Sequence, residues 1–428
     1  GATAAATEVS VGFGQAVTVR HGEVETIEYN RDKGLGITVY IGQQRGNASS
    51  SDFSPQAVRD TVDAALSIAS YTAIDDCSGL PDADMLARDI PDPFDKLRAG
   101  LDLYHPWDLP VDAAIELARQ CEQAALDADK RISNSDGASV NLHESQFVFA
   151  NSLGFIGGYP SSRHSLSCAV IAGQDDAMER DYWYSVARDA SDLLDVQQVG
   201  RIAAERTVRR LNARQIDTMQ VPVLFEAPIA SSLLGHFVGA VSGGSLYRKS
   251  SFLLDQLDKP VFAPHINIED NPDIRKGLAS GPFDDEGVRV QRRVIVENGV
   301  LRGYFLGSYS ARKLGLRTTG NSGGNHNLIL KPSGGLDFAG LLKQMGRGLL
   351  VTELLGSGVN AVTGDYSRGA AGFWVEHGEI QYPVQEITIA GNLKDMFRNI
   401  VAAGNDVLVQ GSKQCGSILV DGMTVAGR

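Results

Sequence analysis

Apolar and polar residues alternate through the first fifty positions, and this pattern predicts β-strands joined by tight turns. Runs rich in Val, Thr and Ile are separated by Gly, and turns are expected at His21-Gly22 and at Gly42. The predicted strands of this region are residues 8–13, 16–20, 24–29, 36–41 and 45–50. Three further strands are predicted at residues 138–143, 146–150 and 163–172.

Three stretches among these strands have the 3.6-residue period of amphipathic helices. The first begins at Ser54-Pro55, because Ser caps a helix and Pro fits its first turn. The other two are predicted at residues 112–129 and 196–211. Residues 76–110 lack a period and are interpreted as a long surface loop. We therefore expect an α+β first part with antiparallel strands and three helices.

The pattern changes after Thr218, where strands and turns begin to dominate. A helix is predicted at residues 228–241, and only short helices follow, at residues 338–345 and 392–402. Hairpins are expected at Asn298-Gly299, His377-Gly378 and Asp421-Gly422. We therefore predict two domains, an N-terminal α+β domain of residues 1–217 and a β-rich domain of residues 218–428.

Composition narrows the classes of function. The formal net charge of −13 disfavours nucleic acid as a ligand, because phosphate binding requires clustered positive charge. No apolar run approaches the roughly 18 residues that span a bilayer, so no membrane partner is expected. No basic and apolar leader precedes the first strand. Four scattered cysteines without a CxxC spacing suit a reducing compartment, and we expect a cytoplasmic protein.

The segment Gly320-Asn321-Ser322-Gly323-Gly324 fits the G-x-S-x-G pattern around the nucleophile of some serine hydrolases. A nucleophilic Ser needs a His base and a carboxylate that orients this His. No His of the first half has the sequence context of a chymotrypsin-like protease. A serine hydrolase that uses Ser322 therefore stays an alternative. The other interpretation is a Gly-rich loop that permits close backbone approach near His326.

Several longer segments are more specific than any short motif. They are GLGITV at residues 34–39, RHSLS at 163–167, GGSLYRKSSFL at 243–253, SYSARKLGLRTTGNSGG at 308–324, and a run through residues 363–396 that begins TGDYSRGAAGFW. Across nearly its whole length the chain resembles the TldD/PmbA family and, within it, the PmbA (TldE) branch. Relative to this family, residues 93–102 (PFDKLRAGLD) are interpreted as an insertion in a surface loop.

The resemblance implies an N-terminal α/β part and a C-terminal β-rich, barrel-like part. It also implies dimers, because TldD and PmbA proteins resemble partners in a heteromeric cytoplasmic metalloprotease that cleaves unfolded peptides. Family names record a proposed modulation of DNA gyrase as well. From the resemblance we expect a TldD-type subunit and a peptide as partners, and a homodimer when the chain is isolated.

The resemblance further implies where the metal chemistry lies. TldD-type subunits carry H-E-x-x-x-H on a helix, and a Cys near the C-terminus completes a zinc site. In this chain Gly235 and Ala240 stand at the two His positions, His236 stands at the Glu position, and Cys415 matches the Cys. A zinc site needs about three protein ligands. Zinc is therefore expected on a TldD-type partner, with no metal and no catalytic residue on this chain.

The segment that begins at Asp365 is the predicted contact with a peptide or a partner, together with Ser322 and His326. Arg368 can pair bidentately with a carboxylate, including a peptide C-terminus, and Trp374 and Tyr382 can supply apolar contact area. The alternative is that Asp365 and Arg368 pair with each other and stiffen a turn. For the whole chain, the alternative to a metallopeptidase subunit is a non-catalytic regulatory homodimer that binds peptides or another protein.

Overall fold

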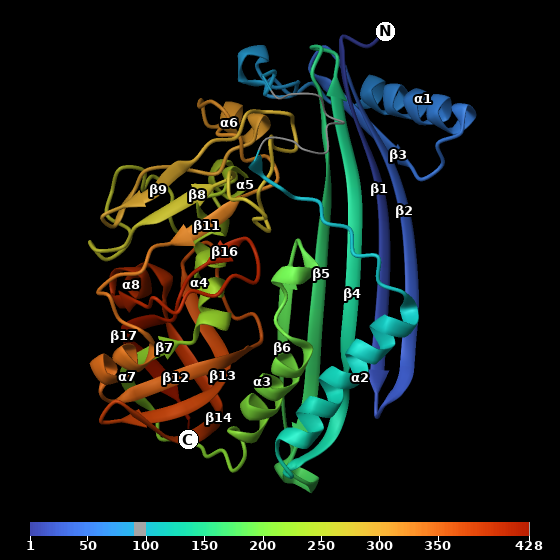
Figure 1. Cartoon of the computed structure of the whole chain (residues 1–428). Helices are drawn as coiled ribbons and strands as arrows, with labels where there is room; N and C mark the ends of the chain where they lie inside the picture. Colours follow the sequence, from blue (N-terminus) through green and yellow to red (C-terminus); the bar gives the residue numbers. More distant parts are fainter. Residues whose placement is uncertain (90–99, 428) are drawn as a thin grey trace.

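The computed structural model describes residues 1–89 and 100–427, which Figure 1 shows from one side. A tall, twisted sheet forms one side of the molecule, and the β-rich C-terminal part lies beside it (Figure 1). The α+β class expected from the sequence is confirmed, and so is the barrel in the C-terminal part. Most of the predicted insertion at residues 93–102 lies outside the described residues. Among the residues that are described, no helix has both the length and the apolar character needed to cross a membrane.

The large sheet is antiparallel, with the strand order β3-β2-β1-β4-β5-β6. Its first turn, at His21-Gly22, is confirmed, and both residues have the positive φ that such a tight turn requires. The hairpin around Gly42 is also confirmed. The strands are β1 (Ala4–Arg20), β2 (Glu23–Ile41), β3 (Gln44–Ser50), β4 (Ile132–Asn151), β5 (Ile156–Ala172) and β6 (Glu179–Ala187).

The strands of this sheet are longer than predicted. The two strands predicted at residues 8–13 and 16–20 are one strand, β1, and those predicted at 24–29 and 36–41 are one strand, β2. Polar residues 28–33 hid this continuity, because residues 23–33 are exposed on both faces of the sheet. Backbone pairing with β1, and not burial, therefore defines this half of β2. The strands predicted at residues 138–143 and 146–150 are likewise continuous in β4.

Three helices pack on one face of the large sheet, the face that carries Ile37, Val17 and Val140. They are α1 (Pro55–Tyr71) over β2 and β3, α2 (Val111–Ala128) over β1 and β4, and α3 (Val196–Val208) over β5 and β6. The Ser54 hydroxyl accepts a hydrogen bond from the Ala57 N–H, as expected for the cap of α1. On the opposite face, Phe155 packs edge to face on Phe283 of the C-terminal part, with ring centroids 5.3 Å apart.

Five strands of the C-terminal part close into a barrel. The order is β14-β13-β12-β7-β17, and β17 also pairs with β14, so these strands leave no open edge between them. The predicted hairpin at His377-Gly378 connects β13 and β14 and is confirmed. The barrel strands are β7 (Met219–Phe225), β12 (Gly348–Leu355), β13 (Asp365–Glu376), β14 (Glu379–Asn392) and β17 (Ile418–Ala426).

A smaller sheet with the order β10-β9-β8-β11-β16 lies above the barrel in Figure 1. Its strands are β8 (Ile268–Asn271), β9 (Arg293–Glu297), β10 (Val300–Leu301), β11 (Asn327–Leu330) and β16 (Lys413–Gln414). The other C-terminal elements are α4 (Ala227–Ala240), α5 (Gly243–Tyr247), α6 (Ser308–Lys313), α7 (Phe338–Met345), α8 (Leu393–Arg398) and β15 (Ile400–Ala403). Short 3-10 helices occur at Ala83–Met85, Asp175–Ala177 and Ala190–Asp192. The hairpin predicted at Asn298-Gly299 joins β9 to β10.

Two predictions for the C-terminal part are wrong. Asp421-Gly422 is not a hairpin, because β17 continues through it, and the dipeptide is a bulge where the pairing with β7 shifts. The helix predicted at residues 392–402 ends at Arg398. The apolar residues Ile400–Ala403 that follow form β15, because they pair with β17 at the side of the barrel.

The close approach of α2 and α3 gives a test of this packing. A Cβ at Gly200 in α3 would lie 2.1 Å from the carbonyl oxygen of Cys121 in α2. We expect Gly200→Ala to lower the free energy of unfolding by about 1–3 kcal/mol, because the helices must separate. Gly239→Ala is the matched control, since a Cβ at this exposed position of α4 meets no atom within 4 Å. Helix propensity predicts that the control raises stability by up to about 1 kcal/mol.

Urea unfolding of both variants measures the difference. A Gly200→Ala protein as stable as the Gly239→Ala protein would contradict the close helix contact.

Candidate functional site

A cavity of about 530 Å³ lies where α4, β12 and β13 meet β6 and α3. We term it the α4 pocket. Helix α4 begins with Pro228 in its first turn and buries one face, which includes Leu233 and Phe237, in the core of the barrel. Gly235 lies on the side of α4 that lines the pocket. Burial of the apolar face thus fixes which α4 residues can meet a ligand.

The three α4 residues at the expected metal positions have other contacts. A Cβ on Gly235 would lie 3.8 Å from Cε of Lys413, so the Lys413 side chain occupies the space beside this glycine. The His236 ring packs edge to face on Tyr366 of β13, with centroids 5.9 Å apart, and its Nε2 has no hydrogen-bond partner. Ala240 is 4% exposed and belongs to the core.

The side chains around α4 do not form a set of zinc ligands among the described residues. Burial, with a smaller contribution from the Arg368 charge, lowers the pKa of His236. Burial raises the pKa of the Cys415 thiol to about 12 in the metal-free chain. Among the described residues, no group of three or more His, Cys, Asp or Glu side chains is placed to hold a metal ion. The donor set on this helix therefore does not fit zinc.

Two cationic side chains that line the α4 pocket have no ion-pair partner among the described residues. Its two acidic side chains, Asp181 and Glu353, are both paired with arginines of α3 or the segment after it. In the part of the chain that the structure describes, Arg368 and Lys413 make no ion pair, although both line this pocket. Burial lowers the pKa of Lys413, which shows how little water compensates its charge.

Asp365 does not pair with Arg368, so the structure contradicts the alternative of a stiffened turn. Its carboxylate accepts hydrogen bonds from the Thr363 hydroxyl at 2.6 Å and from the Asn392 amide at 3.1 Å. These bonds lower the pKa of Asp365. Because residues 366 and 368 point to one side of β13 and residue 365 to the other, Arg368 shares its face with Tyr366 and not with Asp365.

Trp374 and Tyr382 lie opposite each other on β13 and β14, away from the residues that line the α4 pocket. Trp374 is 3% exposed in the barrel core and donates its indole N–H to Glu376, so its ring has almost no surface for a partner. Tyr382 is half-buried and stacks under the Arg214 guanidinium at 4.7 Å. Of the two, only Tyr382 keeps ring surface that a partner can contact.

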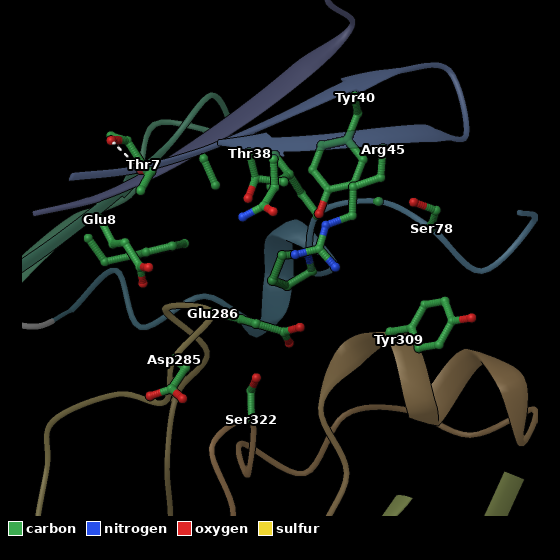
Figure 2. Close-up of a pocket in the computed structure, with 17 residues that line it drawn as sticks. Thr7, Glu8, Thr38, Tyr40, Arg45, Ser78, Asp285, Glu286, Tyr309 and Ser322 are labelled. Carbon is green, nitrogen blue, oxygen red and sulfur yellow. Dashed lines mark hydrogen bonds between the residues drawn. The ribbon is translucent and has the colours of Figure 1, made fainter. Parts of the chain in front are cut away.

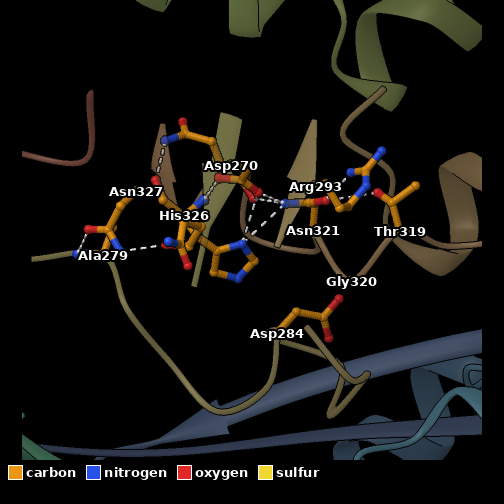
Figure 3. Close-up of polar contacts among 12 residues, drawn as sticks. Asp270, Ala279, Asp284, Arg293, Thr319, Gly320, Asn321, His326 and Asn327 are labelled. Carbon is orange, nitrogen blue, oxygen red and sulfur yellow. Dashed lines mark hydrogen bonds and ion pairs between the residues drawn. The ribbon is translucent and has the colours of Figure 1, made fainter. Parts of the chain in front are cut away.

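His326 belongs to a polar network around Asp270 of the small sheet (Figure 3), whereas the Ser322 backbone N–H donates to Asp284. The buried Asp270 carboxylate accepts the Asn321 side-chain amide and the His326 backbone N–H, and its Oδ2 lies 3.1 Å from His326 Nδ1. Within the described residues, the Ser322 hydroxyl makes no hydrogen bond to His326 or to another imidazole. The structure thus brings His326 to a carboxylate but does not join Ser322 to them as a nucleophile.

The loop around Ser322 approaches neighbouring backbone closely, as its glycines predicted. A Cβ at Gly320 would lie 2.5 Å from the carbonyl oxygen of Arg289, and one at Gly323 would lie 2.4 Å from Asp285. Both glycines have positive φ. Ser322 lines a second cavity of about 340 Å³, into which Glu286 and Arg45 also point (Figure 2).

Comparison with known proteins places the chain in a family. The models for domain 1, the central domain and the C-terminal domain of the PmbA/TldA metallopeptidases match residues 8–69, 104–211 and 218–427. The chain is 55% identical to metalloprotease PmbA of Escherichia coli O157:H7 over 420 residues, which are 98% of this chain and 91% of that protein.

The chain belongs to the PmbA/TldD family. Its fold matches the crystal structure of a proposed DNA gyrase modulator from Bacteroides thetaiotaomicron with a TM-score of 0.91 at 27% identity, over 100% of this chain and 95% of the other. TldE from Thermococcus kodakarensis has the same fold, with a TM-score of 0.85 at 19% identity and coverage of 99% and 97%.

Two residues of the site in this PmbA/TldD chain were not predicted from the sequence. Lys413 lies 178 positions after Gly235 (413 − 235), and no local pattern connects them. Tyr366 lies inside the predicted segment 365–368. It is two positions before Arg368, and in a strand this spacing places both side chains on one face, which could have identified it. The sequence analysis named His236 only as the residue at the Glu position of the TldD-type motif. In the structure its ring packs against Tyr366, and its pKa is lowered by burial.

We expect Ser322 to be unreactive toward a fluorophosphonate probe, because no imidazole takes its proton. Intact-mass spectrometry of the probe-treated chain measures this, with Ser322→Ala as the matched control. Labelling of the wild-type chain that disappears in Ser322→Ala would establish Ser322 as a nucleophile.

The buried carboxyl of Asp284 predicts a pH-dependent stability. Burial raises its pKa from 3.8 to about 7, although the Ser322, Glu286 and Val288 N–H groups donate to it. A folded pKa above the unfolded one stabilises fully below about pH 4, and this contribution is lost as the pH rises through about 7. The loss is about 4 kcal/mol at most, from about 1.4 kcal/mol per pKa unit.

Urea unfolding at several pH values between 4 and 8 tests this for wild type and Asp284→Asn. We expect the fall in stability with rising pH to be smaller in the variant, whatever its absolute stability. Parallel pH curves for the two proteins would show that Asp284 does not hold its proton in the folded state.

Proposed function

We propose that this chain is the PmbA/TldE-type subunit of a TldD-dependent zinc metallopeptidase that acts on unfolded peptides. In this proposal the zinc ion and the hydrolytic step belong to the TldD-type subunit. Membership of a family whose relatives are named metalloproteases supports the peptidase context. The division of labour between two subunits rests on one observation, the position of Lys413 beside Gly235.

A lysine at that place opposes metal binding in two ways. Its ammonium group carries the same sign of charge as a zinc ion, and like charges repel strongly where water is scarce. Its side chain also lies 3.8 Å from the place of a Cβ at position 235, so an imidazole there would compete with it for space. His236 is turned toward Tyr366, and Gly235 and Ala240 carry no donor atom, so α4 offers no set of about three ligands. The subunit then acts by holding peptide and partner in place.

The experiment is a reconstitution. We expect the isolated chain to hold no stoichiometric zinc after chelator treatment and re-exposure to zinc, and to cleave no unfolded peptide. Mixed with a TldD-type subunit, it should support cleavage that requires the metal-binding histidines of that subunit. His236→Ala in this chain should leave the rate within about twofold, because the ring touches no metal in this account. Elemental analysis and mass spectrometry of the cleaved peptide provide the two readouts.

Each outcome assigns a function. One tightly held zinc per isolated chain, lost in His236→Ala or Cys415→Ala, would overturn the proposal. Cleavage by the isolated chain would do the same. Peptide binding without any effect on a TldD-type subunit would instead support the regulatory homodimer.

A further inference from the structure

We infer that the α4 pocket binds the C-terminal carboxylate of a peptide, with Arg368 and Lys413 as its charge partners. The inference deepens the proposed function, because it names which end of a peptide this subunit holds. It depends on the contacts of the pocket in this chain alone, so binding to the isolated chain can be measured without a partner or a cleavage reaction.

Charge is the first support. A half-buried cation is costly unless a negative group lies beside it. Both acidic side chains of the α4 pocket are already in ion pairs with arginines, Asp181 with Arg206 and Glu353 with Arg210. Arg368 and Lys413 stay without a counter-charge in a chain whose formal net charge is −13. A ligand carboxylate that enters the pocket would supply the negative counter-charge that these two cations lack.

Unsatisfied polar atoms are the second support. Trp183 Nε1 and Arg368 Nε are buried and lack a hydrogen-bond partner, and both residues line the α4 pocket. Most buried polar groups in proteins are paired, so two unpaired donors at one pocket indicate a group that is missing from the free chain. A carboxylate accepts up to about four hydrogen bonds, and an arginine can offer it two at once.

The edge of β6 explains why the ligand is the end of a chain and not a strand that passes through. The Tyr182 N–H donates to the Asp181 carboxylate at 2.7 Å, and the Tyr184 carbonyl accepts the Gln410 amide at 3.0 Å. Both backbone groups point away from β5, so part of the pairing edge is already occupied. A peptide that enters end-on leaves both of these hydrogen bonds intact, whereas one that pairs along β6 would have to break them.

The room and the lining define the peptide further. The α4 pocket of about 530 Å³ adjoins a cavity of about 230 Å³, and Lys413, Gln410 and Pro228 line both. The volume of the α4 pocket alone lies within the usual range for ligand sites. Ile229 and Leu354 add apolar surface to the α4 pocket, so an apolar last side chain suits it. The ligand class is therefore a peptide with a free carboxylate and an apolar C-terminal residue.

The test measures fluorescence anisotropy of N-terminally labelled hexapeptides that end in Leu, as the free acid or as the C-terminal amide. The isolated full chain should bind the free acid at least tenfold more tightly than the amide. Arg368→Gln should remove this preference by weakening only the free acid, since Gln keeps hydrogen-bonding groups but not the charge. Lys413→Met, which keeps the length without the charge, should reduce the preference several-fold.

The controls separate this role from a structural one. Arg59→Gln makes the same change on the exposed surface of α1 and should bind both peptides like wild type. Thermal unfolding of each variant checks folding, and Lys413→Met keeps the test valid if Arg368→Gln fails to fold. Equal affinity of acid and amide for the wild-type chain would overturn the inference. So would an amidated peptide with an internal Glu that binds as tightly as the free acid, because the pocket would then take side chains and not the terminus.

Discussion

The packing of α4 against the barrel is the constraint on which the rest of the site depends. Leu233, Phe237 and Ala240 share one core with β7, β13 and β17, and this burial fixes the rotation of the helix. Gly235 then meets Lys413, and His236 meets Tyr366. The closed barrel fixes the register of β13, and this register places Arg368 on the wall of the α4 pocket. Changes at one α4 position therefore alter the site without altering the fold.

Fixed cationic side chains and a bound zinc ion are both positive charges that can act on a peptide. Both stabilise negative charge near a peptide, but only a metal with an open position also activates water. In this chain the α4 pocket keeps positive charge through Arg368 and Lys413, while the buried Cys415 thiol stays protonated with a pKa of about 12. The proposed role of this pocket in holding a carboxylate follows from these two cations.

The sequence predicted the fold well wherever local periodicity reports burial. The helix caps and the turns at His21-Gly22 and His377-Gly378 follow from residue chemistry close in sequence. The continuity of β2 between residues 24–29 and 36–41 was missed because the residues between them are mostly polar and only backbone pairing defines the strand there. The bulge at Asp421-Gly422 was misread because the same dipeptide suits a hairpin.

The site was harder to predict, because its parts meet only in the folded chain. The segment with Arg368 was found from residue type, and the period of two in β13 separates it from Asp365. Lys413 could not be found, since its contact with Gly235 joins residues far apart in sequence. Trp374 was misplaced because an aromatic residue in a strand suits a core as well as an interface.

The most direct test of this account is the position of zinc in crystals of this chain assembled with a TldD-type subunit. An anomalous difference map at the zinc absorption edge locates the metal without reference to activity. The account predicts a peak in the TldD-type subunit and none beside α4 of this chain, where Lys413 covers Gly235. A peak between His236 and Cys415 would contradict it.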